Sequence, residues 1–115
     1  MTFPPAAPAP PLLVEVEAPT SAATVVTITG EIDMVSESQV CTVVTDVLRR
    51  SRPHRLVLDM SDVTFLDSSG VRALIQCRDR AEQLGARLEI HPAHEIVRQV
   101  LSICGIADLF LLQEQ

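Results

Sequence analysis

Hydrophobic and polar residues alternate along most of the chain in short runs that predict strands and helices in turn. The runs Leu12–Glu17 and Ala23–Ile28 are rich in β-branched residues and predict the two strands of a hairpin. The run Arg55–Met60 is more uniformly apolar, which is typical of a strand in the middle of a sheet. Two further short strands are predicted at Arg87–His91 and Leu109–Leu112.

Three segments between these strands carry apolar residues at spacings of three or four, which predicts amphipathic helices. The first helix is Glu37–Arg50. The second begins at the sequence D-S-S-G and stops at Gly85, a residue type that often follows a helix. The third helix is Ala93–Cys104, followed by Gly105. The residues expected to face inward are Val40, Val43, Val44, Val47, Leu48, Val71, Leu74, Cys77, Ala81, Leu84, Ile96, Val97, Val100, Leu101 and Cys104.

This order of elements predicts the α/β class, with one mixed β-sheet of four to five strands packed with three or more α-helices. A chain of 115 residues has the length of one ordinary domain. Residues 1–11 read M-T-F-P-P-A-A-P-A-P-P, which is too rich in proline to pack, so we expect a disordered leader there. The folded domain is expected to cover residues 12–115.

The charge of the chain argues against nucleic acid as a partner. The formal net charge is −6, all nine basic residues are arginine, and the aromatic residues are three phenylalanines. A nucleic-acid binder would show a basic face, whereas this balance suits a protein partner with a basic surface. We find no apolar run of about 18 residues and no signal-peptide pattern, so we expect no membrane segment and a cytoplasmic location.

The three cysteines are Cys41, Cys77 and Cys104, and their spacing matches no C-x-x-C or zinc-binding pattern. Each lies on the apolar stripe of a predicted helix, so we expect three buried thiols that act as small hydrophobic side chains. A redox switch that pairs Cys77 with Cys104 is the alternative. No metal or cofactor is expected.

The segment F-L-D-S-S-G-V-R, residues 65–72, places two serines between an aspartate and a glycine, where a predicted strand meets a predicted helix. Asp67, Ser68 or Ser69 can cap that helix, an effect typically worth about 1 kcal/mol. One capping residue is enough, so capping does not explain two serines followed by Gly70. Glycine at this position lets another surface approach the backbone closely.

Two enzymatic interpretations of this region fit poorly. A receiver or phosphatase site built on Asp59 and Asp62 needs further acids around a magnesium ion and usually a lysine, and the chain contains no lysine. A serine hydrolase needs a G-x-S-x-G elbow, which is absent, and a histidine base. His54, His91 and His94 lie at the ends of predicted elements, where we expect surface positions. We therefore do not expect an enzyme.

The remaining interpretation is that a serine of this segment accepts a phosphate from a separate kinase. A phosphate adds close to two negative charges and three acceptor oxygens. A helix N-terminus tolerates anions, so the fold should survive the modification while the surface seen by a partner changes greatly.

The core V-L-D-M-S-D-V-T-F-L-D-S-S-G-V, preceded by T-G-E-I-D at Thr29–Asp33, resembles the STAS family, specifically the bacterial anti-sigma factor antagonists. The similarity runs from about Leu12 to Leu112. Either motif alone would be a weak signal, whereas the two together at this spacing are specific.

The resemblance implies a partner-switching role in transcription regulation. It implies that Ser68 is phosphorylated by an anti-sigma factor, which is a GHKL-type ATP-dependent serine kinase. The unphosphorylated form would bind that kinase and release a sigma factor, as in bacterial stress responses, and a PP2C-type phosphatase would restore it. The implied partner-binding residues are Asp33, Asp67, Ser69, Gly70, Val71 and Arg72.

Two features depart from the family pattern. Arg72 stands where many members have a small residue, which bears on the choice of partner or on neutralisation of the phosphate. Members commonly continue into a further C-terminal helix, so the covering of the sheet edge and self-association as a homodimer stay open. The alternative function is a phosphorylation-independent STAS scaffold or interaction subunit under redox or ligand control.

Overall fold

The computed structural model describes residues 11–17 and 22–110 of the chain. Within them, β1 (Leu13–Val16), β2 (Ala23–Ile32), β3 (Arg55–Leu66) and β4 (Arg87–Ala93) form one sheet in the order β1-β2-β3-β4. β1 pairs antiparallel with β2, whereas β2, β3 and β4 run parallel. The predicted hairpin and the mixed sheet are therefore confirmed.

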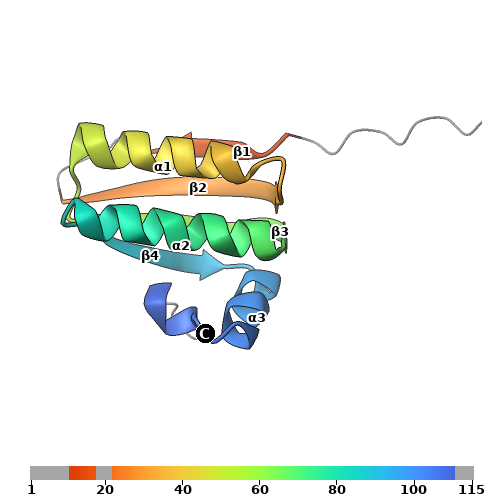
Figure 1. Cartoon of the computed structure of the whole chain (residues 1–115). Helices are drawn as coiled ribbons and strands as arrows, with labels where there is room; N and C mark the ends of the chain where they lie inside the picture. The colour runs from red at the N-terminus through yellow and green to blue at the C-terminus, as the bar shows by residue number, and fades with distance from the viewer. Residues whose placement is uncertain (1–10, 18–21, 111–115) are drawn as a thin grey trace, which may run out of the picture.

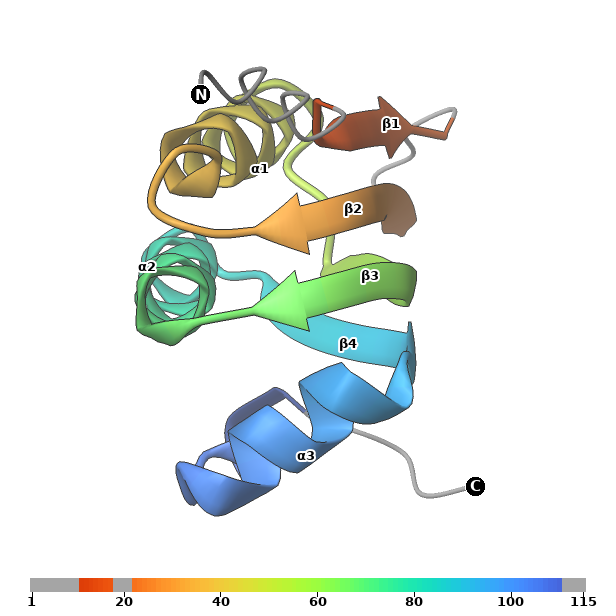
Figure 2. The same ribbon diagram turned by 90° about the vertical axis from the view of Figure 1, so that its right-hand side faces the viewer.

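Two helices cover one face of the sheet and a third lies along its edge (Figures 1 and 2). α1 (Glu37–Ser51) and α2 (Ser68–Gln83) lie side by side on the same face, with their N-terminal ends at the same end of the molecule. α3 (Glu95–Ile103) lies at the β4 edge of the sheet, where it packs against β3, and is followed by a short 3-10 helix, η1 (Ala107–Phe110).

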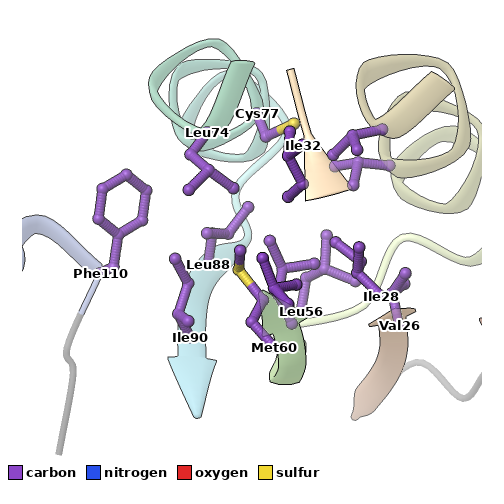
Figure 3. Close-up of a cluster of buried hydrophobic side chains, with 14 of the residues drawn as sticks. Val26, Ile28, Ile32, Leu56, Met60, Leu74, Cys77, Leu88, Ile90 and Phe110 are labelled. Carbon is purple, nitrogen blue, oxygen red and sulfur yellow. The ribbon is translucent and has the colours of Figure 1, made fainter. Parts of the chain in front are cut away.

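The core lies between the sheet and the α1–α2 layer, because alternate residues of β2, β3 and β4 point toward these helices (Figure 3). Burying a leucine, isoleucine or valine side chain contributes roughly 1.5–3 kcal/mol, so this layer provides most of the driving force for folding. The predicted inward face of α1 is confirmed, with Val43 only partly buried. The fully buried residues of the sheet include Val26, Ile28, Leu56, Leu58, Met60 and Ile90.

The strand predicted at Leu109–Leu112 is wrong over the residues that the structure describes. Leu109 and Phe110 belong to the 3-10 helix η1, and residues 111 and 112 lie outside the described residues. Phe110 is fully buried and points into the core near Leu74 (Figure 3). A short apolar run has no periodicity that separates a strand from a buried turn. In place of a fifth strand, η1 contacts β4 and α3 packs against β3 at the same edge of the sheet.

β2 and β3 are both longer than predicted, and this extension positions the candidate site. The pairing of β2 with β3 continues through two irregularities, one of them at Gly30, whose φ is 122°. Glycine adopts this backbone conformation without a steric cost, so the ladder survives the bulge. Pairing therefore runs to the end of both strands, where Ile32 is the register partner of Leu66.

The prediction of three buried thiols is wrong for two of them. Cys77 is buried, Cys41 is half-buried and Cys104 is exposed. α3 ends at Ile103, and Gly105 follows with a φ of 74°, so Cys104 lies at the helix end instead of on its packed face. The leader prediction lies outside the described residues, apart from Pro11, which is exposed.

Candidate functional site

Parallel pairing of β2 and β3 brings the two sequence motifs together at one end of the sheet. Because Ile32 and Leu66 are paired, the next residues, Asp33 and Asp67, start the two connections to the helices from adjacent points. The backbone N–H of Asp67 donates to the carbonyl oxygen of Ile32 at 3.4 Å. The carboxyl ends of neighbouring parallel strands are the usual place for sites in open α/β sheets.

The carboxylate of Asp33 holds the turn between β2 and α1. Its Oδ1 accepts hydrogen bonds from the N–H groups of Val35 at 2.9 Å and Ser36 at 3.1 Å. The Ser36 hydroxyl accepts from the Asp33 N–H at 3.1 Å and donates to the carbonyl of Glu31 at 2.9 Å. The first acid of the candidate site thus has a structural role in its own loop.

This turn presents two large apolar side chains to solvent. Met34 is 72% exposed and Val35 is 87% exposed. The turn between β2 and α1 that carries them lies at the same end of the molecule as the first turns of α1 and α2 (Figure 1). The sequence analysis did not single them out, although two apolar residues between an aspartate and a serine, outside any predicted element, are a signal that it had available.

Asp67, and neither serine, caps α2. Its Oδ1 accepts a hydrogen bond from the N–H of Gly70 at 3.0 Å. Ser68 is the first residue of α2 and is exposed, whereas Ser69 is 8% exposed and counts among the buried polar residues. Ser68 is therefore the more accessible of the two adjacent serines.

Gly70 is buried against the end of the neighbouring strand. A Cβ built on this glycine would lie 2.9 Å from the carbonyl oxygen of Ile32 and would overlap Cδ1 of Leu66. The surface that approaches the glycine backbone is therefore part of the same chain. Val71 is partly buried against the core.

Arg72 links the first turns of the two helices. Its Nη2 lies 3.7 Å from Oε2 of Glu37, and the two side chains are 62% and 29% exposed. An exposed pair at this distance contributes little to stability, roughly 0–1 kcal/mol. Arg72 also follows Ser68 by four residues, which places both on the same face of α2.

Both acids considered for metal-dependent chemistry lie in β3, where Asp59 is hydrogen-bonded to a neighbouring serine. Asp59 Oδ1 accepts from the N–H of Ser61 at 3.1 Å and from its hydroxyl at 2.7 Å, within the irregular part of β3. Asp62 is exposed and is the register partner of Thr29. Over residues 11–17 and 22–110, no group of three or more histidines, cysteines or acids is placed to hold a metal ion.

The fold and this site define a class of protein. It is a single α/β domain that presents a serine at the N-terminus of a helix, beside the turn that begins at Asp33. Residues 14–115 match the model of the STAS domain, and the chain belongs to the STAS family. No helix in the described part of the chain is long and apolar enough to cross a membrane.

The solved structures most informative here are anti-sigma factor antagonists. An antagonist from Mycobacterium paratuberculosis is 26% identical, with a TM-score of 0.72, covering 91% of this chain and 87% of that chain. The antagonist SpoIIAA in its unphosphorylated form is 18% identical, with a TM-score of 0.73 and 90% of each chain covered. The phosphorylated form of SpoIIAA from Bacillus gives a TM-score of 0.64 at 18% identity, with 90% of this chain and 93% of that chain covered. The two SpoIIAA comparisons show the shared fold.

A curated relative is a STAS-domain-containing protein of Pseudomonas aeruginosa (strain UCBPP-PA14). It is 34% identical over 58 residues, which cover 50% of this chain. The match spans 57% of the length of that relative.

Proposed function

We propose that this protein is an anti-sigma factor antagonist that acts by binding and not as an enzyme. In its unphosphorylated form it binds an anti-sigma factor serine kinase of the GHKL type in the cytoplasm and so frees a sigma factor. Phosphorylation of Ser68 ends that binding, and a PP2C-type phosphatase restores it. The observation that carries the proposal is the exposed Ser68 at the start of α2, beside a buried Ser69, in a STAS domain.

The electrostatics of the site support a local switch. A phosphate on Ser68 would lie next to Asp67 in the chain and close to the Asp33 turn, because the ends of β2 and β3 are paired. Two unit charges several ångströms apart interact by about 4 kcal/mol or less at an effective dielectric constant near 20. A partner that covers Ser68 would have to strip water from this concentrated negative charge, and since about 1.4 kcal/mol is a tenfold change in affinity, that cost is enough to release it without a change of fold.

Arg72 moderates this charge without cancelling it. Its guanidinium lies on the same face of α2 as Ser68 and is paired with Glu37 at 3.7 Å. A phosphate competes for this guanidinium because it offers a stronger acceptor than a half-exposed carboxylate. Glu37, the first residue of α1, would then lose its ion-pair partner at the same end of the molecule.

The proposed docking surface combines exposed contacts with residues that shape them. Ser68, Arg72, Met34 and Val35 are exposed and meet the partner directly. The kinase covers the two apolar side chains of the turn, which gives the interaction a hydrophobic anchor. The residues that hold this surface in place are Asp33, Asp67, Ser69, Gly70 and Val71.

Intact-mass spectrometry tests the proposal. The protein is incubated with ATP and, in turn, each GHKL-type anti-sigma factor encoded in the same genome. We expect a single added phosphate with one kinase, its absence in Ser68→Ala, and its retention in Ser69→Ala. Treatment with a PP2C-type phosphatase should remove it. Stable binding to one of these kinases without any phosphate would overturn the switch and leave a phosphorylation-independent scaffold or interaction subunit.

A further inference from the structure

Two cysteine thiols meet where α1 packs against α2. The Cys41 sulfur lies 3.7 Å from the carbonyl oxygen of Ala73 and 3.6 Å from Oε1 of Gln76. Both atoms belong to the turn of α2 that precedes Cys77, and Cys41 and Cys77 line the same groove between the two helices. Figure 3 shows the Cys77 sulfur on the side of α2 that faces α1. The cysteine that shares this groove with Cys77 is therefore Cys41.

The two thiols differ in access to solvent. Cys41 is half-buried and lines a surface groove of about 390 Å³ together with Thr45, Gln76 and Arg80. Cys77 also borders this groove but is only 2% exposed. A small reagent that enters the groove reaches the Cys41 sulfur first.

The two thiols also differ in charge. Donation of a hydrogen bond from Cys77 lowers the pKa of Cys41 to about 7, with a smaller contribution from Arg80, while burial and Glu37 act in the opposite direction. The same hydrogen bond and burial raise the pKa of Cys77. Of the two thiols, Cys41 therefore ionises more readily near neutral pH and is the better nucleophile, while Cys77 stays protonated.

We propose that Cys41 and Cys77 form a hydroperoxide-sensitive pair that closes into a disulfide between α1 and α2. The Cys41 thiolate attacks the terminal oxygen of the hydroperoxide, the O–O bond breaks, and the remainder leaves as an alkoxide or hydroxide that takes a proton from water. Cys41 is then a sulfenic acid. The Cys77 sulfur attacks that sulfenic sulfur, and the hydroxide that leaves takes up the Cys77 proton as water. The two thiols lose two electrons, and the hydroperoxide gains them.

The disulfide would join the two helices whose first turns frame the Ser68 surface. Glu37 and Arg72 already link the same helices by an ion pair nearer to that end. Oxidation of the two cysteines is therefore a second way, besides phosphorylation of Ser68, to change the docking surface. The chemistry at the thiols does not depend on Ser68 being phosphorylated, so it can be tested separately.

The test uses the full chain with Cys104→Ser, which removes the exposed thiol as a route to intermolecular disulfides. Trypsin cleaves this lysine-free chain after arginine, so the three cysteines fall in separate peptides, residues 1–49, 73–78 and 99–115. After treatment with hydrogen peroxide, we expect the intact mass to fall by two hydrogens and peptides 1–49 and 73–78 to be linked. Cys41→Ser should abolish the product.

Cys77→Ala keeps a small apolar side chain at the buried position and should stop the reaction at the sulfenic acid, which dimedone traps on peptide 1–49. In the protein with all three cysteines, iodoacetamide at neutral pH should modify Cys41 about tenfold faster than Cys104. The proposal is overturned if Cys104 reacts first, if Cys41→Ser is oxidised to the same extent, or if no linked peptides form.

Discussion

Gly70 packs against Ile32 so closely that a Cβ on the glycine would lie 2.9 Å from the Ile32 carbonyl oxygen. This contact holds the first turn of α2 against the end of β2 and so sets the position of Ser68 relative to the Asp33 turn. The glycine of D-S-S-G therefore has a steric role within the fold.

Substitution of this glycine should destabilise the protein. We expect Gly70→Ala to lower the free energy of unfolding by about 1–3 kcal/mol, because the buried site has no room for a methyl group. Urea unfolding monitored by circular dichroism measures the change. Gly85→Ala is the comparison, since Gly85 has a φ of 73° but open space around its Cβ position. Gly85→Ala should lose stability through the backbone alone and keep kinase binding, whereas Gly70→Ala should bind the kinase more weakly because Ser68 is displaced. Equal binding by both variants would contradict the positioning role of Gly70.

The capping role of Asp67 at the start of α2 can be separated from the negative charge of its side chain. Asp67→Ala removes the acceptor of the Gly70 N–H and should cost about 1 kcal/mol of stability. Asp67→Asn keeps a side-chain oxygen at the same place and should cost less, although it removes one negative charge near Ser68. Thermal and urea unfolding of both variants tests this order. If Asn is as destabilising as Ala, the charge, and not the cap, is what matters.

The exposed apolar turn should matter for binding and not for folding. Because Met34 and Val35 are 72% and 87% exposed, the double substitution to alanine should change the unfolding free energy by no more than about 0.5 kcal/mol. Affinity for the kinase should fall about tenfold or more. Isothermal titration calorimetry measures it. Val16→Ala is a matched control, since Val16 is 41% exposed and pairs with Val26, away from the end of β2. Unchanged affinity would remove the turn from the docking surface.

The charge at Ser68 should decide binding. Ser68→Ala should bind the kinase without being inactivated, whereas Ser68→Asp should bind it weakly. An aspartate in the first turn of a helix is compatible with the helix dipole, so Ser68→Asp should stay folded. Binding assays with purified kinase and ADP compare the two. Equal affinity of the two variants would show that charge at this position is not the switch.

A buried carboxylate far from the motif should control the acid stability of the fold. Glu89 accepts two hydrogen bonds from Arg55, at 2.7 and 3.0 Å, and lies 3.2 Å from His91. The bonds from Arg55 lower the pKa of Glu89 below its ordinary value of 4.5, against the effect of burial. The stabilisation is therefore present in full above pH 4.5 and is lost as the pH falls through the lowered folded-state pKa.

The measurement is the urea midpoint at neutral pH and near pH 3. We expect Glu89→Gln to be less stable than the natural protein at neutral pH and to lose less on acidification. Asp46→Asn, which removes the exposed partner of Arg50, controls for the loss of one carboxylate. If the urea midpoints of Glu89→Gln and the natural protein fall by the same amount between neutral pH and pH 3, Glu89 does not contribute to the acid stability of the fold.

Local patterns in the sequence were sufficient for most of the elements and for the family. The spacing of apolar residues predicted α1 and α2 because one face of each helix must be buried, and that requirement is written in consecutive residues. The two motifs, T-G-E-I-D around Asp33 and D-S-S-G around Ser68, could each be recognised in the sequence. Hydrophobic periodicity failed at Leu109–Phe110, where the run is too short to define a period.

Tertiary structure decided which atoms of those motifs are available. Three neighbouring residues were equivalent candidates for the cap, and the choice of Asp67 depends on how α2 starts from a strand paired with β2. The burial of Ser69 and the exposure of Ser68 follow from the same placement of the first turn of α2 against the sheet. The meeting of Cys41 with Cys77 depends on the packing of one helix on another. Such contacts join residues far apart in the chain, and no local pattern encodes the relative rotation of two packed helices.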